Sequence, residues 1–264
     1  MQSGFFRRMW QYGWRGDRLE TDAITRANFV ALLPKDGPVL EIGPFAHPAA
    51  TGTNVRYLDI MDRAGLVQRA TAIGLPVENI PEIDYVSPAG DLGVVTDKMR
   101  AVISSHCIEH QPDLIRHLQQ VETSLADGGC YFVIIPDKRY CFDHYLPDST
   151  IADVLEAHHA GRAVHTLASV IEHRALTTHN DPARHWRGDN GPPPDDPERV
   201  RAAIAEHAAA AGGYIDVHAW QFTPRVFREI LRALHALSLT ALVPLRVYDT
   251  QYGSNEFYAV LGRR

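Results

Sequence analysis

The sequence predicts an α/β fold built on a mainly parallel sheet that lies between layers of helices. Over residues 37–139, short apolar segments alternate with segments of helical periodicity. Several of the apolar segments are continuous, which is typical of parallel strands covered on both faces. One helix and two further strands follow residue 223, so we expect seven strands in one sheet.

The first half of the chain begins with a predicted helix over residues 20–33, which Pro34 closes because proline cannot continue a helix. A later helix begins near residue 112 and is expected to stop at Asp127-Gly128-Gly129. The other elements expected here are a helix at 62–74 and strands at 38–43, 55–60, 83–86, 101–105 and 131–135. Only residues 44–54 separate the first two strands, and they contain prolines. A crossover helix with its loops needs more residues, so we expect it to be missing or a single turn.

Residues 140–222 interrupt the pattern and are rich in His, Asp, Pro and Arg. Helical segments are expected near 150–176 and 197–211, whereas 179–197 (HNDPARHWRGDNGPPPDDP) predicts an irregular loop. Thr223-Pro224 starts a further helix, and strands near 240–248 and 256–261 predict an antiparallel hairpin. We therefore expect one domain over 1–264, made of an N-terminal helical and aromatic segment (1–36), a core (37–139), an insertion (140–222) and the completion of the core (223–264).

Composition excludes several classes of protein. The net charge of −6 argues against a sequence-independent nucleic-acid binder, and no apolar run is long enough to predict a transmembrane helix. The N-terminal segment MQSGFFRRMWQYGWRGDR lacks the apolar region of a secretory signal. The cysteines at 107, 130 and 141 are odd in number and have no paired spacing, which predicts a reducing, cytoplasmic environment.

Three motifs lie at strand ends, where open α/β sheets bind ligands. They are VLEIGP at 39–44, YLDI at 57–60 and SSHCIEHQPD at 104–113. With these motifs in this order, the chain resembles the class I S-adenosylmethionine-dependent methyltransferases over 37–139 and 223–262. The resemblance implies a Rossmann-like fold and S-adenosyl-L-methionine as cofactor. One departure is that the family's E/D-x-G-x-G-x-G becomes EIGPFAH at 41–47, with a single glycine.

The resemblance also implies which residues contact the cofactor. Gly43 has no Cβ, so the cofactor can lie against the main chain there. Asp59 can accept hydrogen bonds from both ribose hydroxyls, and Glu41 can hold the ammonium group, directly or through water. An acid after the third strand, here Asp91, meets the adenine amino group. The full set expected at the cofactor is Glu41, Gly43, Pro44, Asp59, Ile60, Asp91, Ser105 and His106.

The string H-x-x-E-H at 106–110 is also a candidate metal site. In a helix, His106, Glu109 and His110 would share one face and could bind a divalent ion. Some methyltransferases bind a divalent ion with E-x-x-E-H at this position, so the resemblance carries over fully only for Glu109 and His110. Two histidines favour Zn²⁺, Mn²⁺ or Fe²⁺ over Mg²⁺. A further ligand could come from the insertion, at His144, His173 or His179.

Without a metal, a histidine could instead be the general base, with His110, His106 and His144 as candidates in that order. An inverted zinc-peptidase motif has the same string, but such motifs lie in long helices and this one follows a strand. The carboxyl end of the fifth strand is where the family builds its acceptor site, and there the insertion offers side chains that suit polyhydroxylated ligands. The expected acceptor-binding residues are His144, His179, Asp181, Arg184, His185 and Trp186.

The resemblance therefore implies an O-methyltransferase. A hydroxyl of a sugar or glycan is the first expectation for the acceptor, because the arginine, acidic, amide and aromatic side chains of the insertion suit polyhydroxylated ligands. A phenolic or other natural-product hydroxyl is the second. Two alternatives stay open: a non-catalytic cofactor-binding module, and a metal-dependent hydrolase that would bind no such cofactor.

Overall fold

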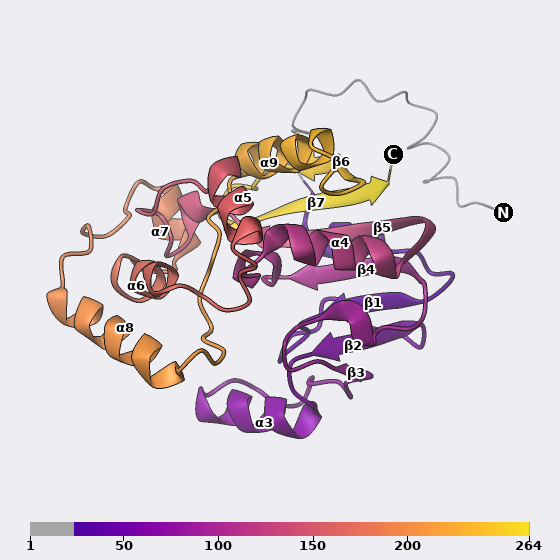
Figure 1. Cartoon of the computed structure of the whole chain (residues 1–264), viewed down its shortest axis with the longest axis horizontal. Coiled ribbons are helices and arrows are strands. Elements are labelled where there is room, and N and C mark those ends of the chain that lie inside the picture. The colour runs from indigo at the N-terminus through magenta and orange to yellow at the C-terminus, as the bar shows by residue number, and fades with distance from the viewer. Residues whose placement is uncertain (1–23, 264) are drawn as a thin grey trace.

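The computed structural model describes residues 24–263, and its core is one seven-stranded sheet of order β3-β2-β1-β4-β5-β7-β6 (Figure 1). Strands β1 to β5 are parallel, and β7 runs antiparallel to both of its neighbours. The mainly parallel sheet with a terminal antiparallel hairpin is thus confirmed. The strands are β1 (Val39–Ile42), β2 (Val55–Asp59), β3 (Tyr85–Val86), β4 (Met99–Ser105), β5 (Leu125–Pro136), β6 (Leu242–Tyr248) and β7 (Glu256–Arg263).

The helices begin at polar caps that the sequence contains. Asp62, Asp113 and Thr223 each accept a hydrogen bond from a backbone N–H in the first turn of the following helix. The described helices are α2 (Arg26–Val30), α3 (Arg63–Ala72), α4 (Leu114–Ser124), α5 (Ile151–His159), α6 (Leu167–Ala175), α7 (Pro182–Trp186), α8 (Pro197–Ala210) and α9 (Pro224–Ala236), with 3₁₀ turns at Leu92–Val94, Ile108–His110 and Lys138–Tyr140.

Both faces of the sheet are covered. Helices α4, α5 and α9 pack together over one face, where they form the larger apolar core with the side chains of β4, β5 and β7 (Figure 1). On the other face, the ring of Phe29 from α2 stacks on Tyr258, with ring centroids 4.9 Å apart, and tilts against Phe132. Burial on both faces explains why the strands read as continuous apolar segments.

Residues 43–54 connect β1 to β2 without a helix, as expected from their number. The carboxylate of Glu41 holds this connection, because it accepts hydrogen bonds from the backbone N–H groups of Ala49 (2.7 Å) and Ala50 (2.9 Å). Ala50 is itself buried beside Val39 and Val55. The two hydrogen bonds to one buried carboxylate thus hold in place a connection that is too short to form a crossover helix.

Three sequence expectations were wrong in detail. Helix α4 ends at Ser124 rather than at the glycines, and 127–129 belong to β5, because β5 begins at Leu125, six residues before the strand expected at 131–135. The loop 179–197 contains a short helix, α7, which Asp181 caps and Pro182 begins. The helix expected at 20–33 is only Arg26–Val30 in the described part, and the aromatic segment before residue 24 lies outside the described residues.

The insertion gathers beyond the carboxyl ends of the parallel strands (Figure 1). Helices α6 and α8 pack on each other, and the chain then returns to the sheet through residues 211–222. This return segment is fastened to the turn after β4: the carbonyl of Glu109 accepts hydrogen bonds from the N–H groups of Ala219 (2.7 Å) and Trp220 (3.1 Å). None of the helices within residues 24–263 has the length and apolar character that a membrane crossing requires.

Candidate active site

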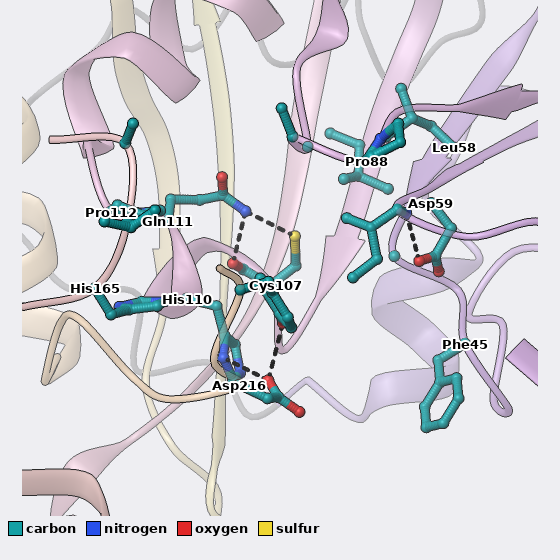
Figure 2. A pocket seen from close by; sticks show the side chains of 18 of the residues that line it. Phe45, Leu58, Asp59, Pro88, Cys107, His110, Gln111, Pro112, His165 and Asp216 are labelled. Carbon is teal, nitrogen blue, oxygen red and sulfur yellow. Dashed lines mark hydrogen bonds and ion pairs between the residues drawn. The ribbon is translucent and has the colours of Figure 1, made fainter. Parts of the chain in front are cut away.

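A cavity of about 520 Å³ lies at the carboxyl ends of β1, β2 and β4, within the size range of small-molecule sites (Figure 2). Gly43, Asp59 and Ile60 line it on the β1–β2 side. Cys107 and His110 line it from the turn after β4, and the insertion contributes His165, Tyr214 and Asp216. This is the point where the order of the parallel strands reverses between β1 and β4, the usual ligand site of an open α/β sheet.

Asp59 ends β2 at the wall of this cavity (Figure 2). One of its carboxylate oxygens accepts a hydrogen bond from the N–H of Ile60 at 2.7 Å. Burial raises the pKa of the Asp59 carboxyl, while that hydrogen bond and the nearby Arg69 guanidinium act in the opposite direction. Nearby Gly43 has a φ of +68°, a backbone conformation that favours glycine. The carboxylate keeps acceptor capacity for a pair of ligand hydroxyls.

The other residues expected at the cofactor divide into two groups. Ile60 and His106 line the cavity, whereas Glu41, Pro44, Asp91 and Ser105 are not among its lining residues. Both oxygens of Glu41 are bound by the 43–54 connection, and burial raises the pKa of this carboxyl to about 7. Asp91 caps a 3₁₀ turn and pairs with Arg116 at 2.9 Å, and the Ser105 hydroxyl accepts a hydrogen bond from Arg26.

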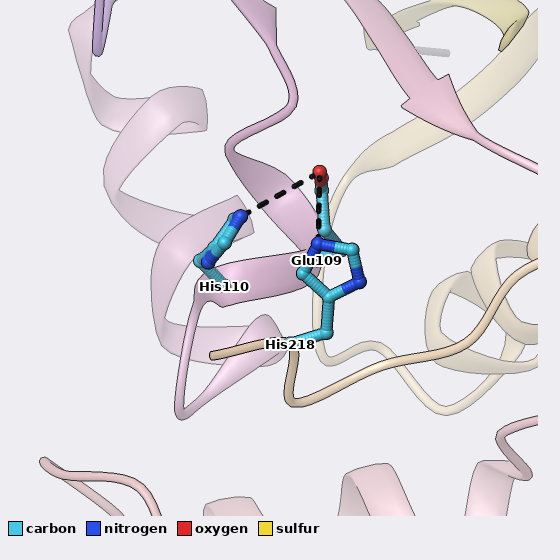
Figure 3. Close-up of side chains that lie close together, drawn as sticks. All are labelled: Glu109, His110 and His218. Carbon is cyan, nitrogen blue, oxygen red and sulfur yellow. Dashed lines mark ion pairs between the residues drawn. The ribbon is translucent and has the colours of Figure 1, made fainter. Parts of the chain in front are cut away.

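Beside the cavity, Glu109 is fully buried, and neither of its carboxylate oxygens has a hydrogen-bond partner. Three histidine nitrogens surround its Oε1 instead: Nδ1 of His106 at 3.7 Å, Nε2 of His110 at 3.8 Å and Nε2 of His218 at 3.9 Å. Figure 3 shows His110 and His218 meeting this carboxylate from two separate chain segments. The ligand atoms of Glu109, His110 and His218 all lie within 4.8 Å of one another. We call these three residues the Glu109 centre.

Each of the three histidines has a second carboxylate near its other ring nitrogen. Nε2 of His106 lies 2.8 Å from Glu256, Nδ1 of His110 lies 3.2 Å from Asp216, and Nδ1 of His218 lies 2.6 Å from Asp143. Although burial opposes its charged form, Asp216 and Glu109 hold the pKa of His110 above its ordinary value. Burial lowers the pKa of His218 to about 3, so this imidazole is neutral at pH 7.

The turn after β4 differs from the helical face that the H-x-x-E-H spacing predicts. Residues 108–110 form a 3₁₀ turn, and His106 adopts a left-handed φ of +49°. As a result, His106 is partly exposed and stands outside the close group of three. The sequence did not predict His218, because nothing local places it near Glu109. Of the further ligands expected from the insertion, His173 lies behind His218 and accepts a hydrogen bond from its backbone N–H.

The strand order 3-2-1-4-5-7-6, with the seventh strand antiparallel, decides the fold family. The chain has the fold of the class I S-adenosylmethionine-dependent methyltransferases. No family model matches the sequence, and no curated protein matches it.

Several solved structures are similar to this chain at low sequence identity. The CcbJ methyltransferase of Streptomyces caelestis is 14% identical, with 90% of this chain and 94% of that chain covered and a TM-score of 0.45. DhpI in complex with SAH is 14% identical, with 86% and 76% covered and a TM-score of 0.40. A Rhodobacter sphaeroides protein named a zinc-dependent alcohol dehydrogenase is 14% identical, with 97% and 94% covered and a TM-score of 0.45. At these values the similarities decide nothing about activity.

Five of the six residues expected to bind the acceptor lie at 179–186, in a loop that its own side chains hold together, and the sixth, His144, lies earlier in the chain. His185 bonds the side chain of Asn190 and the carbonyl of His179, which in turn bonds the carbonyl of Asp189. Arg184 also pairs with Asp189 at 2.7 Å. The Trp186 indole donates to the carbonyl of Ser254, Asp181 caps α7, and His144 bonds the carbonyl of Arg139. None of the six lines the described cavity.

Several of the residues that do line the cavity could not be predicted from the sequence. Arg69 from α3 pairs with Asp216 at 2.5 Å, and its guanidinium lies over the rings of Phe45 and Tyr214. His165 is buried, and neither of its ring nitrogens has a hydrogen-bond partner. Burial lowers the pKa of His165 to about 4, which makes it a neutral imidazole at pH 7. The insertion thus reaches the cavity through 163–165 and 212–216 rather than through its histidine-rich loop.

Proposed function

We propose that this protein is an S-adenosylmethionine-dependent methyltransferase that methylates a hydroxyl group of a small molecule. The observation that carries the proposal is the position of Asp59, which ends β2 and faces a cavity at the strand-order reversal, next to Gly43 with its positive φ. A carboxylate at this point can bind two adjacent ribose hydroxyls of the cofactor, as the resemblance of the YLDI motif implies.

In the proposed reaction, the acceptor oxygen attacks the sulfonium methyl in line, the carbon–sulfur bond breaks, and S-adenosylhomocysteine leaves. The hydroxyl proton must be removed as the oxygen–carbon bond forms. The chain contributes mainly positioning, since an aligned acceptor and methyl group need little covalent help from the protein. His165 suits a hydrogen bond to the acceptor hydroxyl, because it lines the cavity as a neutral imidazole with both nitrogens unpartnered.

Two of the three histidines predicted as the general base lie at this cavity. His110 and His106 line it, whereas His144 does not. We extend the proposal to a divalent ion at Glu109, because a fully buried carboxylate without a hydrogen-bond partner is costly unless a cation neutralises it. When bound, such an ion supplies a Lewis acid that lowers the pKa of an acceptor hydroxyl.

For the acceptor we propose the hydroxyl of a sugar or glycan. The cavity offers polar groups on several sides, from Arg69, Asp216, Gln111 and His165, together with the rings of Phe45 and Tyr214. Polar side chains with an aromatic face are the combination that suits a polyhydroxylated ring. A phenolic hydroxyl is the competing acceptor, which fewer of these polar groups would serve.

Two measurements test the proposal. Calorimetry with S-adenosylhomocysteine should show binding to the wild-type chain, and its absence would sink both the enzyme and the non-catalytic module and leave the hydrolase alternative. Transfer of a labelled methyl group should then be measured against nucleotide sugars, reducing-end glycans and catechols. Label found only on catechols would replace the sugar acceptor by the phenolic one. Binding without transfer to any fraction of a cell extract would favour the module.

A further inference from the structure

We infer that the Glu109 centre is a binding site for one first-row transition-metal ion, such as Zn²⁺, Mn²⁺ or Fe²⁺. We further infer that Asp143 and Asp216 are positioning residues, which orient the two histidines of the centre. His106 lies beside the centre, with its Nδ1 3.7 Å from Oε1 of Glu109. The inference rests on the proposed function only for the use of the ion in methyl transfer, because the ligand set stands on geometry alone.

The orientation of the side chains suits a cation at this place. Asp143 accepts the proton of Nδ1 of His218 at 2.6 Å, which leaves the lone pair of Nε2 facing Glu109. His110 is turned the same way, with Nδ1 3.2 Å from Asp216 and Nε2 facing Glu109. Two imidazole nitrogens from separate chain segments therefore face a buried carboxylate oxygen that has no hydrogen-bond partner. A cation between them would give that oxygen and both nitrogens a partner.

The distances suit one ion. Ligand atoms that bind a common ion at about 2.0–2.2 Å lie roughly 3–4 Å apart. The two nitrogens of the Glu109 centre lie 3.8 Å and 3.9 Å from Oε1 of Glu109. The other possible group, made of Asp143, His173 and His218, is less suited. Its His218 already donates Nδ1–H to Asp143, and Nδ1 of His173 already accepts the backbone N–H of His218. Asp143 and His173 therefore hold His218 in place rather than binding a second ion.

The charges also match a divalent ion. Arg69 pairs with Asp216, and Arg26 pairs with Glu256, so two of the four carboxylates are neutralised by arginine. Glu109 and Asp143 have only histidines in ion-pair contact within residues 24–263. Within the described residues these two buried carboxylates thus have no lysine or arginine in ion-pair contact, and a divalent ion at the centre would supply positive charge there.

The donor set selects the kind of ion. Mg²⁺ and Ca²⁺ prefer oxygen ligands, whereas imidazole nitrogen suits zinc and its first-row neighbours. Here two imidazole nitrogens and one carboxylate oxygen meet, and a third imidazole, His106, lies 3.7 Å from the same oxygen. A carboxylate behind each ligating histidine is also the usual arrangement around zinc, where it fixes the tautomer and makes the nitrogen a stronger ligand.

The test uses the full chain, purified without a polyhistidine tag, stripped with a chelator and titrated with Zn²⁺, Co²⁺, Mn²⁺ and Mg²⁺. We expect one Zn²⁺ or Co²⁺ per chain, visible ligand-field absorption with Co²⁺, and Mg²⁺ binding that is weaker by orders of magnitude. Glu109→Gln and His218→Ala should lose the ion. Asp143→Asn should keep it with roughly 10- to 100-fold lower affinity, as found when outer partners of ligating histidines are removed.

His159→Ala is the matched control, because His159 is an exposed histidine at the end of α5, outside the centre, and its loss should change nothing. Calorimetry with S-adenosylhomocysteine reports on each variant's fold and separates the two proposals. Zinc binding without binding of this ligand would overturn the proposed function and leave the metal centre standing. Sub-stoichiometric metal in a chain that binds the ligand would overturn the metal centre, as would unchanged Zn²⁺ affinity in Glu109→Gln.

Discussion

Two histidine-rich regions of this chain have similar compositions and opposite chemistry. In the loop 179–191, ring nitrogens of His179 and His185 bond backbone carbonyls or a side-chain amide, so these imidazoles hold the loop together. Around Glu109, His110 and His218 each have one ring nitrogen near a carboxylate, and the other faces an acid without a hydrogen-bond partner. Satisfied hydrogen bonds mark a structural histidine. Ring nitrogens that converge on a buried, unpartnered acid mark a site.

The largest effect that this comparison predicts is at Glu109. Glu109→Gln should lower methyl transfer about 1000-fold, or ~4 kcal/mol, since a Lewis acid supplies several kcal/mol of transition-state stabilisation. The same change removes an uncompensated buried charge, so the metal-stripped chain should become more stable by about 1–3 kcal/mol in urea unfolding. If the stripped variant were instead less stable than the stripped wild type, the carboxylate would have a partner and the comparison would fail.

A buried histidine outside both regions predicts how the stability of the folded chain depends on pH. His117 lies on the buried face of α4, its Nε2 is 3.0 Å from the Tyr131 hydroxyl, and burial lowers its pKa to about 4. Because the folded chain resists protonation that the unfolded chain accepts, this residue's contribution is complete above pH 6.5 and is lost as the pH falls toward 4. The loss amounts to about 3 kcal/mol.

Urea unfolding at pH 7 and pH 4.5 measures this loss. His117→Gln should be less sensitive to the change of pH than the wild type by most of that amount. Equal pH sensitivity in the two chains would show that His117 is not the titrating group.

Cofactor binding should be separable from the histidines altogether. Asp59→Ala should weaken S-adenosylhomocysteine binding by about 1.5–3 kcal/mol, the usual contribution of hydrogen bonds to a charged group. Glu229→Ala, an exposed acid on α9, is the matched control. Calorimetry reads both, and unchanged affinity in Asp59→Ala would remove the cofactor assignment. Zn²⁺ content should be the same in both variants.

The smallest expected effect is in the histidine-rich loop. His185→Ala leaves Asn190 and the carbonyl of His179 without their partner, which should lower the free energy of unfolding by about 1–2 kcal/mol. Affinity for Zn²⁺ and for S-adenosylhomocysteine should stay as in the wild type. A loss of acceptor turnover without a loss of stability would return this loop to the acceptor site and contradict the distinction drawn here.

The order of the strands, the missing crossover helix and the strand-end position of Asp59 could be predicted from the sequence. These features are local: periodicity reports which residues are buried, and the length of 44–54 limits what can form there. The adjacency of Glu109 and His110 is local as well. The folded chain was needed to show that His218, from a distant segment, completes the Glu109 centre and that Glu41 holds a loop rather than lying at the cavity. Such contacts depend on where the insertion returns to the sheet, and no local spacing in the chain encodes that return.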